Sequence, residues 1–108
     1  MSDFLGHLQT LVKRGEVIVS RHGLLELAAR DILLDDVVAG VAAAIPVEEY
    51  PAYVKGPSVL VLQRDNQDRP VHVVWGIAGG TVTPVVLVTA YRPDPARWSM
   101  DFLRRRKE

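Results

Sequence analysis

Apolar side chains recur at helical spacing in the first part of the chain. Residues 3–13 place them three or four positions apart, which predicts a short helix. Ser20 is a typical N-cap residue, and the apolar positions after it predict a second helix over about 21–30. A third helix is expected to begin near Asp35, because acidic residues favour the positive end of a helix dipole. Pro46 cannot continue a helix and should end it.

After residue 46 the pattern changes to runs that favour strands. Strands are expected at about 58–62, 69–75 and 85–91, with turn-forming residues between them. Short turns favour antiparallel pairing of consecutive strands. The apolar segment 17–19 fits either a short strand or an extended linker. Residues 94–107 are expected to form a helix or turn. The sequence therefore predicts an α+β fold: N-terminal helices packed on an antiparallel sheet of three to four strands, followed by a short C-terminal helical segment.

The composition fits a single domain, expected to span residues 1–108. Hydrophobic residues make up 48% of the chain, which is enough to build one core. The 13 basic and 13 acidic residues balance, which argues against a surface that is basic throughout. The apolar runs are too short to cross a bilayer, and the first residues lack the pattern of a signal peptide. We therefore expect a cytoplasmic location without membrane contact.

No common cofactor or metal motif is present in the sequence. There is no cysteine, which excludes disulfides and thiolate metal sites. A phosphate-binding glycine loop, a His-Glu-x-x-His motif and a nucleophile elbow are also missing. We therefore expect chemistry without a cofactor or a metal.

Two histidines are candidates for proton transfer, because an imidazole titrates near neutral pH. His22 lies at the expected start of the second helix, where the dipole favours the neutral, base-competent ring. The alternative is a solvated first-turn residue. His72 lies in the middle of an expected strand, on the face opposite Val71 and Val73. The alternative for His72 is a hydrogen-bonded, partly buried side chain without a catalytic role.

Arginines gather toward the end of the chain. The planar guanidinium suits phosphate because it donates two hydrogen bonds at once, although a solvated terminus is the alternative. Tyr91 and Trp98 lie near this cluster and have the rings needed to stack on unpaired bases. For Trp98, packing of the last segment onto the sheet is the alternative. The predicted RNA-binding residues are Arg92, Arg97, Arg104, Arg105 and Arg106.

An ordered set of segments resembles the domain of unknown function 4258 family. No single segment is specific, but their order along the chain is. The first 15 or so residues fall outside the resemblance, so we expect an N-terminal helical extension over 1–15 and a family-like core over 16–108. The matching segments are residues 20–23, 35–37, 48–51, 57–62, 69–74 and 89–95, followed by Trp98.

The resemblance implies a curved sheet like that of the RelE and BrnT toxins, which are small metal-independent ribonucleases of bacterial toxin–antitoxin pairs. RNA and an antitoxin protein are the partners that it implies. Two positions depart from the family pattern. Glu26 stands where an arginine usually follows the histidine by four residues, which removes a phosphate ligand and adds a repulsive charge. Leu33 replaces a usual Ser or Thr before the third helix, which affects helix capping.

Three functions remain as alternatives. The first is a toxin-like, metal-independent endoribonuclease, attenuated by Glu26, in which a base, an acid and a cation act on the phosphate. It requires both histidines to share one accessible pocket. The second is an inactive protein- or RNA-binding module. The third is a homodimer that pairs through an exposed strand edge at 85–88. The catalytic candidates, which match the family's polar signature, are His22, Arg30, His72 and Tyr91.

Overall fold

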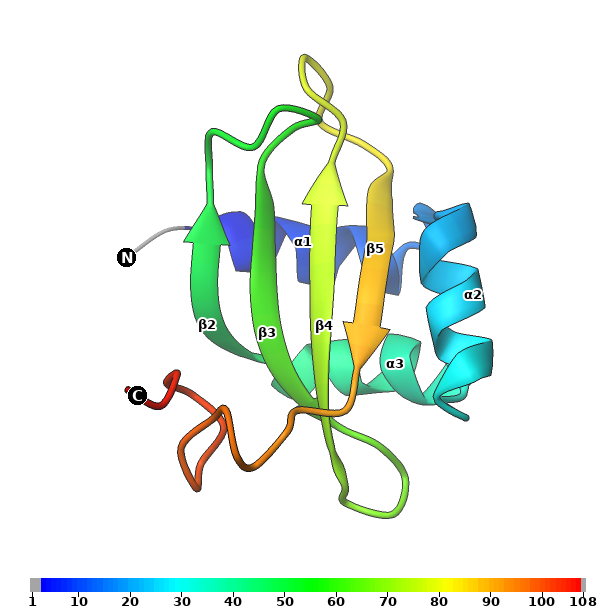
Figure 1. Cartoon of the computed structure of the whole chain (residues 1–108). Helices are drawn as coiled ribbons and strands as arrows, with labels where there is room; N and C mark the ends of the chain where they lie inside the picture. Colours follow the sequence, from blue (N-terminus) through cyan, green and yellow to red (C-terminus); the bar gives the residue numbers. More distant parts are fainter. Residues whose placement is uncertain (1–2, 108) are drawn as a thin grey trace.

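The computed structural model describes residues 3–107. Three helices come first, and the last four strands follow them (Figure 1). The helices are α1 (Phe4–Lys13), α2 (Arg21–Ala29) and α3 (Leu34–Gly40), and a 3-10 turn over Val41–Ala43 extends the third. The strands are β1 (Val17–Val19), β2 (Ile45–Tyr50), β3 (Ser58–Arg64), β4 (Pro70–Ile77) and β5 (Val85–Tyr91).

The five strands form one mixed sheet in the order β1-β5-β4-β3-β2. Strands β2 to β5 pair antiparallel, whereas β1 runs parallel to β5, with Val17 opposite Val85. The prediction of an antiparallel sheet of three to four strands is therefore wrong. A three-residue apolar run does not specify a partner that lies far away in the sequence, so β1 was not assignable from local pattern. Because β5 lies between β1 and β4, the expected free edge at 85–88 is absent from this sheet.

The C-terminal segment is a hairpin and not a helix, so the prediction of a C-terminal helical segment is wrong within the described residues. In this C-terminal hairpin (residues 97–106), the Ser99 amide donates to the Arg104 carbonyl at 2.8 Å. The Arg106 amide donates to the Arg97 carbonyl, also at 2.8 Å. Phe102 has a φ of 61°, a left-handed conformation that interrupts a helix.

The start of α2 confirms the predicted N-cap. The Ser20 hydroxyl accepts from the Gly23 amide at 2.8 Å and donates to the Val88 carbonyl at 3.0 Å. Gly23 lets the helix approach β5 closely, since a Cβ on this residue would lie 2.7 Å from the Leu87 carbonyl oxygen. Ser20 thus fixes both the first turn of α2 and its position against the sheet.

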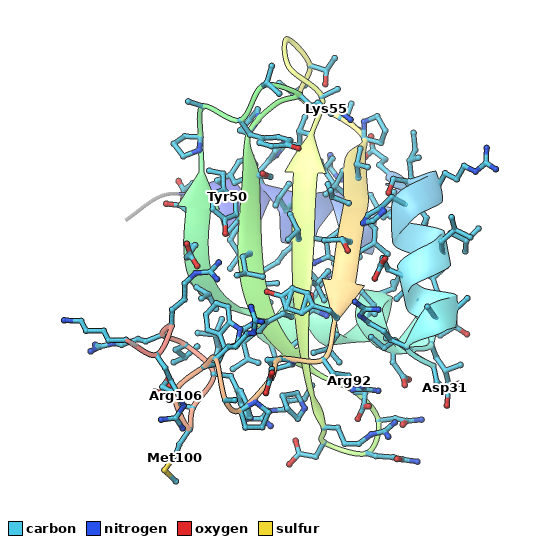
Figure 2. All side chains as sticks on the ribbon, viewed as in Figure 1. Asp31, Tyr50, Lys55, Arg92, Met100 and Arg106 are labelled. Atoms are coloured by element: carbon cyan, nitrogen blue, oxygen red, sulfur yellow. The ribbon has the colours of Figure 1, made fainter. Side chains whose placement is uncertain are left out.

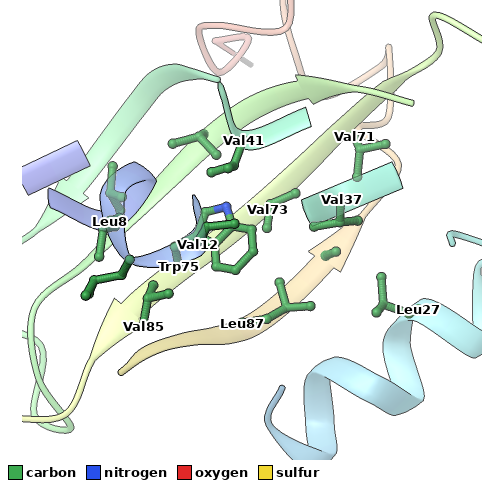
Figure 3. Packing of buried hydrophobic residues seen from close by; sticks show 14 of the residues in the cluster. Leu8, Val12, Leu27, Val37, Val41, Val71, Val73, Trp75, Val85 and Leu87 are labelled. Atoms are coloured by element: carbon green, nitrogen blue, oxygen red, sulfur yellow. The ribbon is translucent and has the colours of Figure 1, made fainter. Parts of the chain in front are cut away.

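The hydrophobic core lies between the sheet and the helices α1 and α3, which cover one face (Figures 1 and 3). Trp75 is fully buried at its centre. Its indole N–H donates to the Gln63 side-chain oxygen at 2.8 Å, and the Gln63 amide donates to the Val37 carbonyl at 2.8 Å. Helix α1 contributes Leu8, and it is therefore part of the core.

The opposite face of the sheet, here called the helix-free face, is not covered by any helix of the described part of the chain (Figure 1). The C-terminal hairpin lies against one end of it. Because Val59 and Val61 point into the core, alternation places Ser58 and Leu60 on this face. Among residues 3–107, no helix is long and apolar enough to span a membrane.

Candidate functional site

Five side chains with acid–base or cationic chemistry converge at the hairpin-covered end of the helix-free face. They come from four separate elements: two from β2, one from β4, one from β5 and one from the C-terminal hairpin. This group, called the polar cluster below, consists of Glu48, Tyr50, His72, Tyr91 and Arg105.

Strand register explains why these residues meet. His72 lies opposite Tyr91 across the β4–β5 pair. At the edge of the sheet formed by β2, Glu48 pairs with Leu60 of β3, and Tyr50 pairs with Ser58. Paired residues project from the same face of a sheet, so all four side chains of the cluster that come from strands share the helix-free face.

His72 is the buried member of the cluster, with no exposed surface. Its Nε2 lies 2.8 Å from the carbonyl oxygen of Phe102, and its Nδ1 lies 3.2 Å from the Tyr91 hydroxyl. A carbonyl only accepts, so Nε2 carries the proton, and in the neutral ring Nδ1 accepts from Tyr91. Burial lowers the pKa of His72 and outweighs the Phe102 carbonyl, which raises it. His72 is therefore a neutral side chain that holds the Tyr91 hydroxyl in place.

Trp98 closes the cluster from the hairpin side. Its ring meets the His72 ring edge-on, with 4.4 Å between centroids, and Trp98 is 4% exposed. The Arg105 guanidinium lies 4.7 Å from the Trp98 ring centroid, a cation–π contact. These contacts confirm that Trp98 packs the last segment onto the sheet, so its ring is not free to stack on a base.

The rim of the cluster reaches solvent. The Arg105 Nε lies 2.8 Å from a Glu48 carboxylate oxygen, and these side chains are 62% and 36% exposed. Burial lowers the pKa of Arg105, but the Glu48 carboxylate and the Tyr50 hydroxyl outweigh it and raise that pKa overall. Burial and Glu48 raise the pKa of Tyr50, and burial also raises the pKa of Tyr91. Both phenols therefore keep their protons at neutral pH.

Clear pKa shifts concentrate in this cluster. Among the described residues, six side chains have a clearly shifted pKa, and four of them are Tyr50, His72, Tyr91 and Arg105. Titratable groups with shifted pKa values gather at functional sites more often than elsewhere. The cluster is therefore the candidate site.

His22 and Arg30 lie elsewhere, on the exposed side of α2. The His22 Nε2 is 3.9 Å from a Glu26 carboxylate oxygen, and Arg30 forms an ion pair with the same carboxylate at 2.9 Å. The structure thus brings together His72 and Tyr91, but it does not place His22 or Arg30 with them. The requirement that both histidines share one accessible pocket is therefore not met, because His72 has no exposed surface and His22 lies on α2. Glu26 occupies Arg30, so this arginine has a carboxylate partner already.

The predicted RNA-binding arginines have different surroundings. Arg92 forms an ion pair with Asp65 at 2.9 Å, and Asp65 also binds Arg69 at 3.0 Å. The Asp65 side chain is 1% exposed. Burial raises the pKa of Asp65, but two backbone amides and the two arginines lower it overall to about 2. Arg92 therefore anchors the β3–β4 turn.

The other arginines lie on or beside the surface of the C-terminal hairpin. Arg97 and Arg106 line a hollow of about 430 Å³ together with Arg105 and Lys107. Arg104 is exposed. The Arg106 Nε donates to the Pro95 carbonyl at 2.8 Å, which fixes part of this surface.

Sequence reasoning missed Glu48 and Tyr50 as site residues. They stand two positions apart on β2, a spacing that places both on one face of a strand. The two-residue spacing of these polar side chains on one strand was the signal that the sequence contained. The register that sets them beside the rest of the cluster includes a bulge between Pro46 and Glu48, which no local pattern announces. No group of three or more His, Cys, Asp or Glu side chains in residues 3–107 is arranged to hold a metal ion.

The fold and the site define a class: a small α+β domain with a polar, titratable cluster on the helix-free face of its sheet. Residues 19–92 match the family described as "Domain of unknown function (DUF4258)", and the chain belongs to this family. The expected family membership is thus confirmed, whereas the likeness to the RelE and BrnT toxins is not. Neither the curated proteins nor the solved structures contain a match to the chain. The family segment includes His72 and Tyr91 but ends before the C-terminal hairpin.

Proposed function

We propose that this protein is a metal-independent endoribonuclease that uses the polar cluster. One observation carries the proposal. A carboxylate, two protonated phenols and a guanidinium converge on a rim that solvent reaches, over an imidazole that holds one of the phenols. Cleavage of RNA without a metal needs a base, an acid and a cation for the phosphate. The rim supplies all three.

The chemistry assigns a role to each group. Glu48 accepts the proton of a ribose 2′-hydroxyl, whose oxygen attacks the adjacent phosphorus. The bond from phosphorus to the 5′-oxygen breaks, which leaves a 2′,3′-cyclic phosphate. Tyr50 or Tyr91 gives a proton to the departing 5′-oxygen. Arg105 stabilises the negative charge on the phosphate, a role that its guanidinium suits.

Two contacts of the cluster bear on this mechanism. Arg105 and Glu48 pair with each other in the structure, and a phosphate between them would replace the carboxylate as the partner of Arg105. His72 has no exposed surface, and both of its ring nitrogens have partners. We therefore assign His72 as a positioning residue for Tyr91 and not as the base. His22 and Arg30 have no role in this mechanism.

The test is cleavage of single-stranded RNA in the presence of a metal chelator. The wild-type protein should release fragments with cyclic-phosphate ends. Glu48→Gln removes the base but keeps the size and the hydrogen-bonding capacity of the side chain, so activity should fall by about 100-fold or more. Glu49→Gln, the next carboxylate along β2 but on its opposite face, is the matched control and should retain activity. Equal activity of Glu48→Gln and wild type, or loss of activity in Glu49→Gln, would contradict the proposal.

A toxin role is part of the same proposal, and its basis is the likeness to RelE- and BrnT-type toxins that membership of this family implies. Induced expression should arrest bacterial growth, and Glu48→Gln should relieve the arrest. An antitoxin would be the expected partner. Co-expression of a neighbouring gene that restores growth and co-purifies with the protein would support this; arrest by Glu48→Gln equal to that by wild type would contradict it.

A second candidate is an RNA-binding module without cleavage. The observation that favours it is the hollow of about 430 Å³ lined by four cations on and beside the C-terminal hairpin, next to a Glu48 that is already paired. Binding should weaken as salt rises, and loss of one phosphate contact should reduce the salt slope by about one. Arg97→Ala with Arg106→Ala should weaken RNA binding in fluorescence anisotropy, whereas Arg14→Ala should not. Binding without any cyclic-phosphate product would favour this candidate over the first.

A further inference from the structure

A second concave region lies on the helix-free face, between the N-terminus of α2 and the loop that follows β2. This upper groove has a volume of about 330 Å³. That volume falls at the lower end of the range for small-molecule sites, about 300–1,000 Å³. Lys55 lines this groove, and Figure 2 labels it together with Tyr50. Its polar and aromatic lining comes from Ser20, His22, Tyr53, Lys55 and Ser58.

The floor of the groove is flat and apolar. Gly76 lies on β4 between Ser58 and Val86, which are its partners on the neighbouring strands. A Cβ on Gly76 would lie 3.2 Å from the Ser58 Cβ and 3.4 Å from a Val88 methyl group. Ser58 and Val88 therefore approach Gly76 closely, and Gly76 itself projects no side chain into the groove. A planar, largely apolar group fits such a floor.

Ser58 is the most informative residue of the groove. It is 5% exposed, and its hydroxyl makes no hydrogen bond with the described residues. Every fully inaccessible side-chain polar atom in this part of the chain has a partner, so the Ser58 hydroxyl reaches the groove. By contrast, the other buried polar side chains, such as Gln63 and His72, are hydrogen-bonded. A ligand in the groove would supply the partner that Ser58 lacks.

The rim of the groove favours an anion beside an aromatic ring. Lys55 is exposed and forms no ion pair within residues 3–107. The nine-residue helix α2 begins at the groove, and the amide groups of a helix N-terminus attract negative charge. Tyr53 is 50% exposed, so its ring is available for stacking. Among residues 3–107, no carboxylate lines the groove.

We propose that the upper groove binds one nucleotide unit. The base lies on the floor at Gly76, next to the Tyr53 ring and within reach of the Ser58 hydroxyl. The phosphate lies at Lys55 and the start of α2. An anion, a flat ring and a hydrogen-bonding edge together are the chemistry of a nucleotide, and stacking on an aromatic ring suits an unpaired base.

The groove adjoins the polar cluster. Ser58 and Tyr50 are directly paired between β2 and β3, so the two regions are neighbours on one face. This inference rests on the proposed function. In that function the nucleotide belongs to the RNA strand and lies next to the linkage that the polar cluster cleaves. The groove would then select RNA whose base at this position is unpaired.

The experiment is a titration of ¹⁵N-labelled protein, followed by NMR, with adenosine 5′-monophosphate, adenosine and inorganic phosphate as separate probes. The nucleotide should shift the amides of Gly56, Ser58 and Gly76 in a saturable manner, more tightly than either fragment alone. Tyr53→Ala and Lys55→Ala should each weaken this binding by about tenfold. Lys13→Ala, an exposed lysine on α1, is the matched control and should bind like wild type.

The outcomes separate this inference from the proposed function. Phosphate binding as tightly as the nucleotide, or shifts that avoid the groove, would overturn the nucleotide site. If the wild type cleaves RNA and both Tyr53→Ala and Lys55→Ala have the same KM as the wild type, the nucleotide site is overturned. The proposed function stands in that case. Nucleotide binding at the groove without RNA cleavage by the wild type would uphold the site and overturn the proposed function. A single-stranded oligonucleotide that binds more tightly than the mononucleotide identifies RNA as the source.

Discussion

The two faces of the sheet differ in how their polar groups are used. On the helix-covered face, Trp75 and Gln63 form a closed chain of hydrogen bonds that ends on the backbone of α3. On the helix-free face, the Ser58 hydroxyl makes no hydrogen bond within the described residues, and the Glu48–Arg105 pair is open to solvent. Buried polar groups are normally satisfied because leaving them unpaired destabilises the fold. The first face therefore serves stability, and the second keeps groups that stability does not require.

The hairpin adds to this contrast. Helices α1 and α3 cover the core face with apolar side chains, whereas the C-terminal hairpin covers part of the other face with Trp98, Phe102 and Arg105. The hairpin lies outside the family segment, which ends at Arg92. The family core thus supplies His72 and Tyr91, and this chain's own C-terminal segment supplies the cation that faces Glu48.

The largest expected effect on stability comes from the two buried tryptophans, Trp75 on the core face and Trp98 in the C-terminal hairpin. Equal losses of stability for the two would contradict the contrast between the faces. Trp75→Ala should lower the free energy of unfolding by about 3–5 kcal/mol, because it opens a cavity in the core. Trp98→Ala should lower it by about 1–3 kcal/mol, because the hairpin can relax around the gap. Urea unfolding followed by circular dichroism measures both. A larger loss for Trp98→Ala would mean that the hairpin, and not the core face, dominates stability.

The buried carboxylate of Asp65 is a polar group whose assigned role is structural, and its effect on stability can be measured. Its pKa is about 2 in the folded protein against an ordinary value of 3.8, so its carboxylate stabilises the fold above pH 4. That contribution, about 2 kcal/mol, should disappear as the pH falls from 4 to 2. Asp65→Asn should remove it at neutral pH, whereas Asp68→Asn in the same turn should have little effect. Equal losses for the two variants would contradict the assigned role of Asp65.

His72 tests the buried part of the polar cluster. Its pKa lies below the ordinary value of 6.5, so the unfolded chain takes up a proton first as the pH falls. Stability from this group is therefore complete above about pH 6.5 and decreases below it. Urea midpoints at pH 7.5 and 5.5 should show the decrease in wild type and in His22→Ala, but a smaller one in His72→Gln. If the urea midpoint of His72→Gln decreased as much as that of the wild type, the decrease would originate from another group.

Arg105 should have the smallest effect on stability. Its pair with Glu48 is largely exposed, and such pairs contribute about 0–1 kcal/mol. Arg105→Ala should therefore unfold almost like wild type while RNA cleavage falls strongly. Arg104→Ala, one residue away and exposed, is the control for nonspecific loss of charge. Loss of cleavage in both variants alike would indicate a general electrostatic effect.

Local pattern was sufficient for some elements and not for others. The cap at Ser20 and the strand at 85–91 depend on short-range chemistry, so the sequence predicted them. The pairing of β1 with β5 joins residues far apart in the chain, and no local signal specified it. The C-terminal helical segment was wrong because a left-handed residue at Phe102 and cross-hairpin bonds override the helical spacing.

The candidate site was predicted in part for the same reason. Residue chemistry pointed to His72, Tyr91 and Arg105, which the fold does bring together. It pointed equally to Arg92, whose partner Asp65 is a buried carboxylate that only the folded structure reveals. Identical side chains thus take structural or functional roles according to tertiary neighbours, which a sequence does not display.

The central claim is that RNA binds to the helix-free face of the sheet. A single-stranded RNA with a 2′-O-methyl group at each position cannot be cleaved by the proposed route, and its binding can be mapped by amide shifts. We predict shifts at Tyr50, Ser58 and Gly76, with α1 and α3 unaffected. Shifts confined to α1 and α3, or no saturable binding, would contradict the account.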